Sequence, residues 1–88
     1  MNQPLHPLAQ EGYISQRLKE SGYVMSKINL ITWQIAEVRT GLTYALTIRD
    51  QAFYCLPLHG SEQGASTIQT LVRAALQESA RLDRSHLH

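Results

Sequence analysis

One short segment brings three chemically active side-chain types together. Residues 59–62 read His-Gly-Ser-Glu, so an imidazole, a hydroxyl and a carboxylate follow one another. Nucleophilic catalysis needs a base within hydrogen-bond reach of the hydroxyl and a third group that orients this base. Neighbours in one loop meet that geometry only by accident, and a polar segment with glycine is typical of a solvated connector. We therefore expect no catalytic residues here and a chain that is not an enzyme.

The other histidines and the cysteine do not form a cofactor or metal site. His86 and His88 lie near the chain end, without the Cys or carboxylate cluster that would complete a zinc shell. His6 has no partner at a useful spacing. Cys55 is the single cysteine, which excludes an intrachain disulfide. Its place beside Leu46 predicts an inert core thiol, and we expect no cofactor and no metal.

Composition narrows the class of protein. A length of 88 residues leaves room for one domain, and 43% hydrophobic with 17% charged residues is typical of an ordered globule. Lys+Arg 8 against Asp+Glu 7 lacks the basic excess of a dedicated nucleic-acid binder. The longest apolar run, residues 52–58, is far shorter than the roughly 20 residues of a membrane span. The first residues lack a signal-peptide pattern, so we expect a cytoplasmic protein without membrane contact.

Residues 42–49 alternate between apolar and polar side chains, which predicts a strand with one buried face. Two-residue loops at 40–41 and 50–51 would fold the neighbouring segments back against it. These loops place the large apolar residues opposite one another: Trp33 with Ile48, Ile35 with Leu46, Ile48 with Phe53, and Leu46 with Cys55. The sequence therefore predicts a three-stranded antiparallel meander whose apolar side chains share one face.

Helical patterns lie on both sides of this meander. A first helix is predicted over about residues 8–21, with Gly22 ending it. A last helix is predicted from Ser66, where Ser66 and Gln69 form a capping-box pattern before an apolar stripe. Residues 23–30 fit a strand, a helix or a loop. The expected fold is α+β in the order α-β-β-β-α, with both helices on one sheet face, residues 1–7 a flexible lead-in and residues 85–88 a flexible tail.

The uncovered face of the predicted sheet is the more informative surface. Val38, Ala45, Tyr54 and Leu56 could form a contiguous, modestly apolar patch there. Such a patch on a small domain indicates a protein partner or a second copy, and small proteins also expose apolar atoms without a partner. Pro57 disfavours edge pairing by its strand, so face-to-face association, including a homodimer, is the expected contact.

Three segments resemble the HicA family of small toxins, which have a double-stranded-RNA-binding-domain-like fold. Residues 18–23 resemble the end of that family's first helix, where a Gly-aromatic pair leads into the first strand. Residues 56–60 resemble its third strand and exit, and residues 67–75 resemble its final helix. The resemblance covers about a third of the chain and implies the same order of helices and strands.

The chemistry of that family is not matched. Its RNA-cleaving histidine follows a glycine at the start of the second strand, where this chain has Gly41-Leu42-Thr43-Tyr44. RNA-binding domains of this fold place lysines at the start of the last helix, and the corresponding positions here are uncharged. The resemblance therefore supports the fold and argues against ribonuclease activity.

Together these observations predict a non-enzymatic binding module that acts by protein–protein contact. Its size and its resemblance to a toxin family indicate a small regulator or inhibitor of the kind that mobile elements carry. The alternative is an RNA-binding or RNA-cleaving component, as the HicA-like segments would imply. In that case Arg49, His59, Arg73 and Arg81 would contact the RNA.

Overall fold

The computed structural model describes residues 7–49 and 52–86, and the surroundings of the side chains of residues 10–49 and 52–81. The elements follow the order α1 (Pro7–Glu20), β1 (Tyr23–Lys27), β2 (Thr32–Glu37), β3 (Thr43–Arg49), β4 (Ala52–Pro57) and α2 (Glu62–His86). All strands pair antiparallel in the order β1-β2-β3-β4. The α+β class and the two helices are as predicted, but the sheet has four strands where the sequence predicted three.

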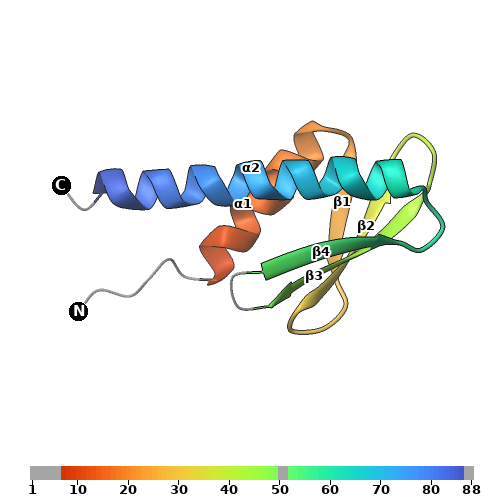
Figure 1. Cartoon of the computed structure of the whole chain (residues 1–88), viewed down its shortest axis with the longest axis horizontal. Helices are drawn as coiled ribbons and strands as arrows, with labels where there is room; N and C mark the ends of the chain where they lie inside the picture. Colours follow the sequence, from red (N-terminus) through yellow and green to blue (C-terminus); the bar gives the residue numbers. More distant parts are fainter. Residues whose placement is uncertain (1–6, 50–51, 87–88) are drawn as a thin grey trace.

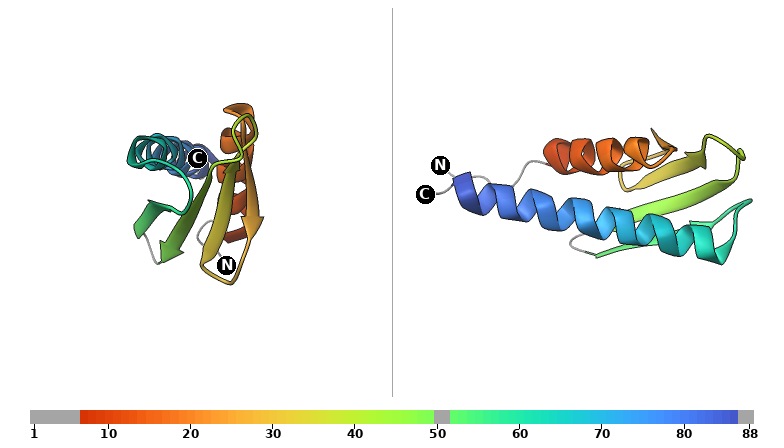
Figure 2. Two further views of the ribbon diagram at one scale, coloured as in Figure 1. Left: turned by 90° about the vertical axis from the view of Figure 1, so that its right-hand side faces the viewer. Right: turned by 90° about the horizontal axis from the view of Figure 1, so that it is seen from above.

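Both helices lie on one face of a twisted sheet (Figures 1 and 2). Helix α1 packs beside β1, and helix α2 runs along β4. The two helices contact each other, crossing in Figure 1 and running in opposite directions in the right view of Figure 2. The 25 residues of α2 span about 37 Å at 1.5 Å per residue, which is most of the 43 Å length of the molecule. In Figure 1 the C-terminal end of α2 extends beyond the sheet.

The core lies between the helices and the inner face of the sheet. Every strand contributes side chains of one parity to it, as the alternation of a strand requires. Among the described side chains, the buried apolar ones come from all six elements: Ile14, Leu18, Tyr23, Trp33, Ile35, Tyr44, Leu46, Cys55, Ala65, Ile68, Val72 and Ala75. The predicted apolar face is confirmed, because Ile48 and Phe53 also pack against this core.

Strand β1 resolves the ambiguous stretch of the sequence. Gly22 ends α1 in the left-handed region, at φ 91°, as the predicted helix end requires. The chain then enters β1 directly and pairs with β2, with Tyr23 opposite Glu37 and Lys27 opposite Trp33. Ile28 and Ile31, which lie at helical spacing with Ile35, are instead exposed in the β1–β2 loop.

The β2–β3 register differs from the predicted one by two residues. Trp33 lies opposite Leu46 and Ile35 opposite Tyr44, whereas a two-residue loop at 40–41 would have placed Ile48 and Leu46 there. The observed loop has four residues, between Glu37 and Leu42, and Gly41 adopts φ 74° within it. A two-residue type I′ loop needs positive φ at both positions, which the β-branched Thr40 disfavours. A slip of two residues leaves every side chain on its predicted face.

The β3–β4 register is the predicted one. Ile48 lies opposite Phe53 and Leu46 opposite Cys55. The connecting residues Asp50 and Gln51 lie outside the described residues. The predicted lead-in, residues 1–7, also lies outside them except for Pro7, the first residue of α1. Of the predicted tail, residues 85–88, the structure describes Ser85 and His86 as the last residues of α2.

Helix α2 begins earlier than predicted. The Ser61 hydroxyl accepts a hydrogen bond from the Gly64 amide at 3.0 Å, which is the contact of an N-cap residue. The predicted capping box was wrong, because Ser66 lies inside the helix and the Gln69 amide donates instead to the Cys55 carbonyl at 3.1 Å. An acidic residue, Glu62, stands in the first turn and favours a start at this position.

The start of α2 is fixed on the sheet by Tyr44. This tyrosine is 1% exposed and points from β3 toward the segment that leads into α2. A Cβ added to Gly60 or to Gly64 would overlap the Tyr44 ring or its hydroxyl. The two glycines are therefore required for the backbone to approach the ring closely, and they join a central strand to the first turn of α2.

We expect Gly64→Ala to lower the free energy of unfolding by about 1–3 kcal/mol, because the added methyl group overpacks the buried Tyr44 site. Gly12→Ala is the matched control, since that glycine lies in α1 with nothing within 4 Å of an added Cβ. The control should leave stability unchanged or raise it by up to about 1 kcal/mol. Urea unfolding followed by circular dichroism measures both. Equal effects of the two substitutions would contradict the proposed packing.

Candidate functional site

The outer face of the sheet carries the residues that the sequence predicts for partner contact. Ala45 lies on β3 directly opposite Leu56 on β4, and Tyr54 lies opposite Thr47. Tyr54 and Leu56 are 53% and 62% exposed. The structure therefore brings three of the four predicted residues, Ala45, Tyr54 and Leu56, together on one face that neither helix covers (Figure 2).

Val38 is placed differently from the prediction. It lies beyond the end of β2 in the loop to β3, and it is 67% exposed. Its amide donates to the Gly22 carbonyl at 2.9 Å, which holds this loop beside the start of β1. Val38 is therefore a loop residue near the β1 side of the sheet, away from the β4 side where Tyr54 and Leu56 lie.

Two further apolar residues belong to the outer face. Val24 on β1 is 50% exposed, and Leu58, which follows β4, is 52% exposed. The Leu58 amide donates to the Thr43 carbonyl at 3.0 Å, so Leu58 continues the row of Leu56 and Tyr54 along the β4 side. Val24 was missed because β1 was not assigned as a strand. Once β1 is recognised, alternation with the buried Tyr23 places Val24 outward.

The middle of the outer face is almost free of charge. Gln34, Ala36, Thr43, Ala45 and Thr47 occupy β2 and β3 there, and each is only partly exposed. Arg49, at the end of β3, is the one charged residue among the described outward positions of the four strands. Charge depletion together with exposed aromatic and aliphatic side chains is typical of the centre of a protein interface.

The residues of the RNA alternative lie apart from one another. His59 follows β4, where its Nδ1 lies 3.2 Å from the Thr43 hydroxyl, and Arg49 is at the opposite end of β3. About 20 Å of extended strand separates these two ends. Arg73 lies on α2 with its guanidinium carbon 5.8 Å from the centre of the Phe53 ring. Arg81 lies two turns further along α2, about 30 Å from the helix start near His59.

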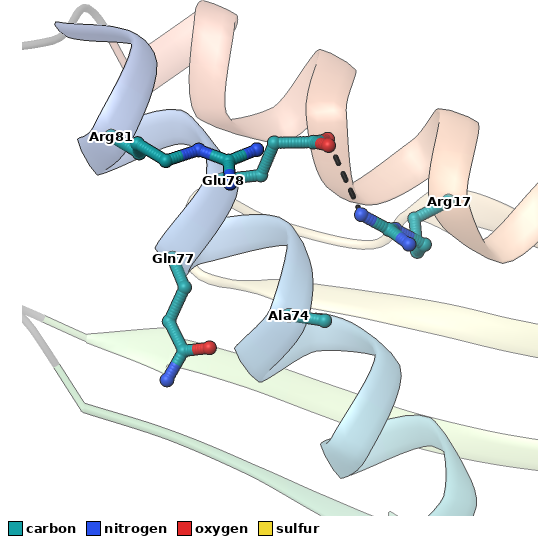
Figure 3. A pocket seen from close by; sticks show the side chains of 5 residues that line it. All are labelled: Arg17, Ala74, Gln77, Glu78 and Arg81. Atoms are coloured by element: carbon teal, nitrogen blue, oxygen red, sulfur yellow. Dashed lines mark ion pairs between the residues drawn. The ribbon is translucent and has the colours of Figure 1, made fainter.

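Arg81 lines a polar hollow between the two helices. Figure 3 shows this hollow, which has a volume of about 270 Å³ and is lined by Arg17, Ala74, Gln77, Glu78 and Arg81. The Arg17 Nη2 atom lies 3.3 Å from the Glu78 Oε1 atom, so an ion pair from α1 to α2 crosses it. Both side chains are more than a third exposed, and such pairs contribute little stability.

Cys55 is a buried thiol, as the sequence predicts. It is 2% exposed, and burial raises its pKa from the ordinary 9.0 to about 11. Among the described residues no group of three His, Cys, Asp or Glu side chains could hold a metal ion. In the same part of the chain, neither helix is long and apolar enough to cross a membrane. His6 and His88 lie outside the described residues, and the side chain of His86 is not described.

A scan against protein-family models, a search of curated proteins and a search of solved structures each found no match to this chain. We therefore infer the function from the geometry of the outer face and of the exposed helix surface.

We expect iodoacetamide to modify Cys55 slowly at pH 8 in the folded protein. The raised pKa lowers the thiolate fraction on the order of 100-fold relative to an exposed thiol, and the thiolate is the reacting form. Because folding favours the protonated thiol, its contribution to stability is present below pH 9.0 and is lost as the pH rises toward about 11. Mass spectrometry of timed samples measures the rate. Thr70→Cys supplies an exposed internal reference, and equal rates at the two sulfurs would contradict the prediction.

Proposed function

We propose that this chain is a non-catalytic binding module that contacts a protein partner through the outer face of its sheet. The observation that carries the proposal is the row of exposed apolar residues along β4, with Tyr54 and Leu56 each more than half exposed beside Ala45. An exposed patch of this kind on a small domain marks an interaction surface.

The composition of this surface supports a protein as the partner. The outward residues at the centre of β2 and β3 are uncharged, and the larger Tyr54 and Leu56 lie along one side. Tyrosine is enriched among the residues that dominate binding energy, because it covers a large area with few rotatable bonds. A partner that buries Tyr54 and Leu56 would gain most of its affinity from the β4 side.

The electrostatics of the face favour protein over RNA. RNA binding requires cations that replace the counterions of the phosphates, and the described outward strand positions include one, Arg49, at a corner of the sheet. The competing proposal is RNA binding by the exposed arginines of α2, Arg73 and Arg81. These two share one side of the helix, with the uncharged Gln77 between them.

The biological setting is part of the same proposal. We propose a small regulator or inhibitor of the kind that mobile elements carry, acting in the cytoplasm. The support is the short chain, its resemblance to a toxin family and the presence of a single cysteine as a free thiol, which suits a reducing compartment.

The variant Tyr54→Ala with Leu56→Asp tests the outer face. Affinity capture from a native lysate, with and without nuclease, first identifies the partner, and titration with the purified partner then gives the dissociation constant. We expect the double variant to weaken binding at least about 30-fold, since two exposed anchors are lost. Circular dichroism should stay unchanged, because both side chains are exposed in the free chain.

The control variant carries Gln63→Asp with Thr70→Ala, two exposed positions on α2 that the proposed surface does not include. This control should bind like the parent chain. Partner binding that survives the Tyr54 and Leu56 changes would refute the outer-face proposal. Capture that requires RNA, weakens with salt and is lost in Arg73→Ala would instead establish the RNA alternative.

A further inference from the structure

The two edges of the sheet differ in how their free backbone groups are protected. On β4 the amide of Leu58 faces β3, since it donates to the Thr43 carbonyl. By alternation, the groups of Phe53, Cys55 and Pro57 face outward. Pro57 has no N–H to donate, and the Cys55 carbonyl already accepts the Gln69 amide at 3.1 Å. Two separate features therefore block the addition of a further strand to β4.

Among the described residues, the β1 edge carries no such protection. Ile28 donates to the Thr32 carbonyl and Val38 to the Gly22 carbonyl, so even-numbered positions of β1 face β2. The N–H and C=O groups of Tyr23, Met25 and Lys27 therefore face outward. No hydrogen bond within the described part of the chain uses these outward groups. The left view of Figure 2 shows β1 at the margin of the sheet, with α1 covering its inner face.

We propose that the β1 edge pairs with β1 of a second copy of this chain, which joins two four-stranded sheets into one. The pairing is antiparallel about a two-fold axis at Met25. It sets Met25 opposite Met25 of the second copy and Tyr23 opposite Lys27 of the second copy. This register uses every outward-facing group of both strands. It also satisfies the self-complementarity that a two-fold interface requires.

The seam is the boundary between the two paired β1 strands. On its outer side, apolar side chains of one copy meet apolar side chains of the other. In this register Val24 faces Ser26 of the second copy and lies diagonal to Val24 and Ile28 of the second copy. Val24 is 50% and Ile28 55% exposed in the single chain. Pairing therefore covers four exposed aliphatic side chains, two from each copy, which a strand from an unrelated protein would match only by chance.

The inner side of the seam is complementary in charge. Tyr23 lies opposite Glu37 within one chain, so Lys27 of the second copy enters a row beside Tyr23 and Glu37. Within one chain, Lys27 pairs with Trp33 at the other end of the ladder, about 13 Å along the strand from Glu37. Across the seam, Lys27 of the second copy and Glu37 lie in one row two strand spacings apart, about 10 Å between backbones, with Tyr23 between them. This is nearer than within one chain, and the two-fold axis repeats the arrangement.

Sedimentation of the full chain tests the dimer. We expect a mass of twice the 9.9 kDa of one chain at high micromolar concentration. Val24→Lys should sediment as a monomer, because it replaces the apolar contact with two ammonium groups at diagonal positions of the seam. The matched control is Ala52→Lys on the blocked β4 edge, an exposed position outside the proposed partner surface; it should remain a dimer.

Exchanging the charges of Lys27 and Glu37 tests the proposed register of the two β1 strands. Lys27→Glu and Glu37→Lys each place like charges in the same row on both sides of the axis, so each variant alone should dissociate at least about threefold more readily at low salt. In an equimolar mixture, every cross-seam pair of the mixed dimer again joins one acid and one base. The mixture should therefore dimerise like the parent chain, with circular dichroism confirming that both variants are folded.

Three results would overturn the proposal. They are a parent chain that stays monomeric, a Val24→Lys variant that remains a dimer, and a mixture of the charge variants that associates no better than each variant alone. A monomeric parent chain would leave the β1 edge to a strand of another protein. The Tyr54→Ala, Leu56→Asp variant should remain a dimer, so failure of the outer-face proposal and failure of the dimer are distinguishable.

Discussion

Both helices of this protein pack on the same face of its sheet, and the surfaces described above follow from that arrangement. The inner residues of the two central strands, such as Ile35 and Leu46, are completely buried beneath Ile14 and Leu18 of α1 and Ile68 of α2. Alternation along each strand then sends the remaining side chains to the opposite face. No described helix covers that face, so the outward side chains of the strands determine how apolar or charged it is.

The parity of the strands could be predicted from the sequence more securely than their pairing. The run over residues 42–49 alternates so regularly that any register shift by two residues keeps the same face buried. Ala45, Tyr54 and Leu56 were therefore assigned correctly to the outer face although the β2–β3 register was not. The loop length was the missing quantity, because a two-residue loop and a four-residue loop both suit a glycine at position 41.

Strand β1 and the start of α2 could not be predicted from the pattern of apolar residues in the sequence. Only one of the five β1 side chains, Tyr23, is buried, so an edge strand leaves almost no apolar alternation in the sequence. The start of α2 depends on Tyr44, whose ring needs glycine at positions 60 and 64. Two glycines four residues apart were the available signal. The aromatic partner that explains them is far away in the chain and is found only from the folded arrangement.

The proposed pairing at the β1 edge also determines how the outer faces of the two copies are arranged. Antiparallel pairing at β1 keeps the outer faces of both copies on the same side of the joined sheet, since alternation continues across the seam. The two β4 strands would then lie seven strand spacings apart, about 34 Å before twist is considered. A partner that reaches both copies would bind the second at a high effective concentration. Because Pro57 and Gln69 block β4, association through edges stops at two copies and no open-ended sheet forms.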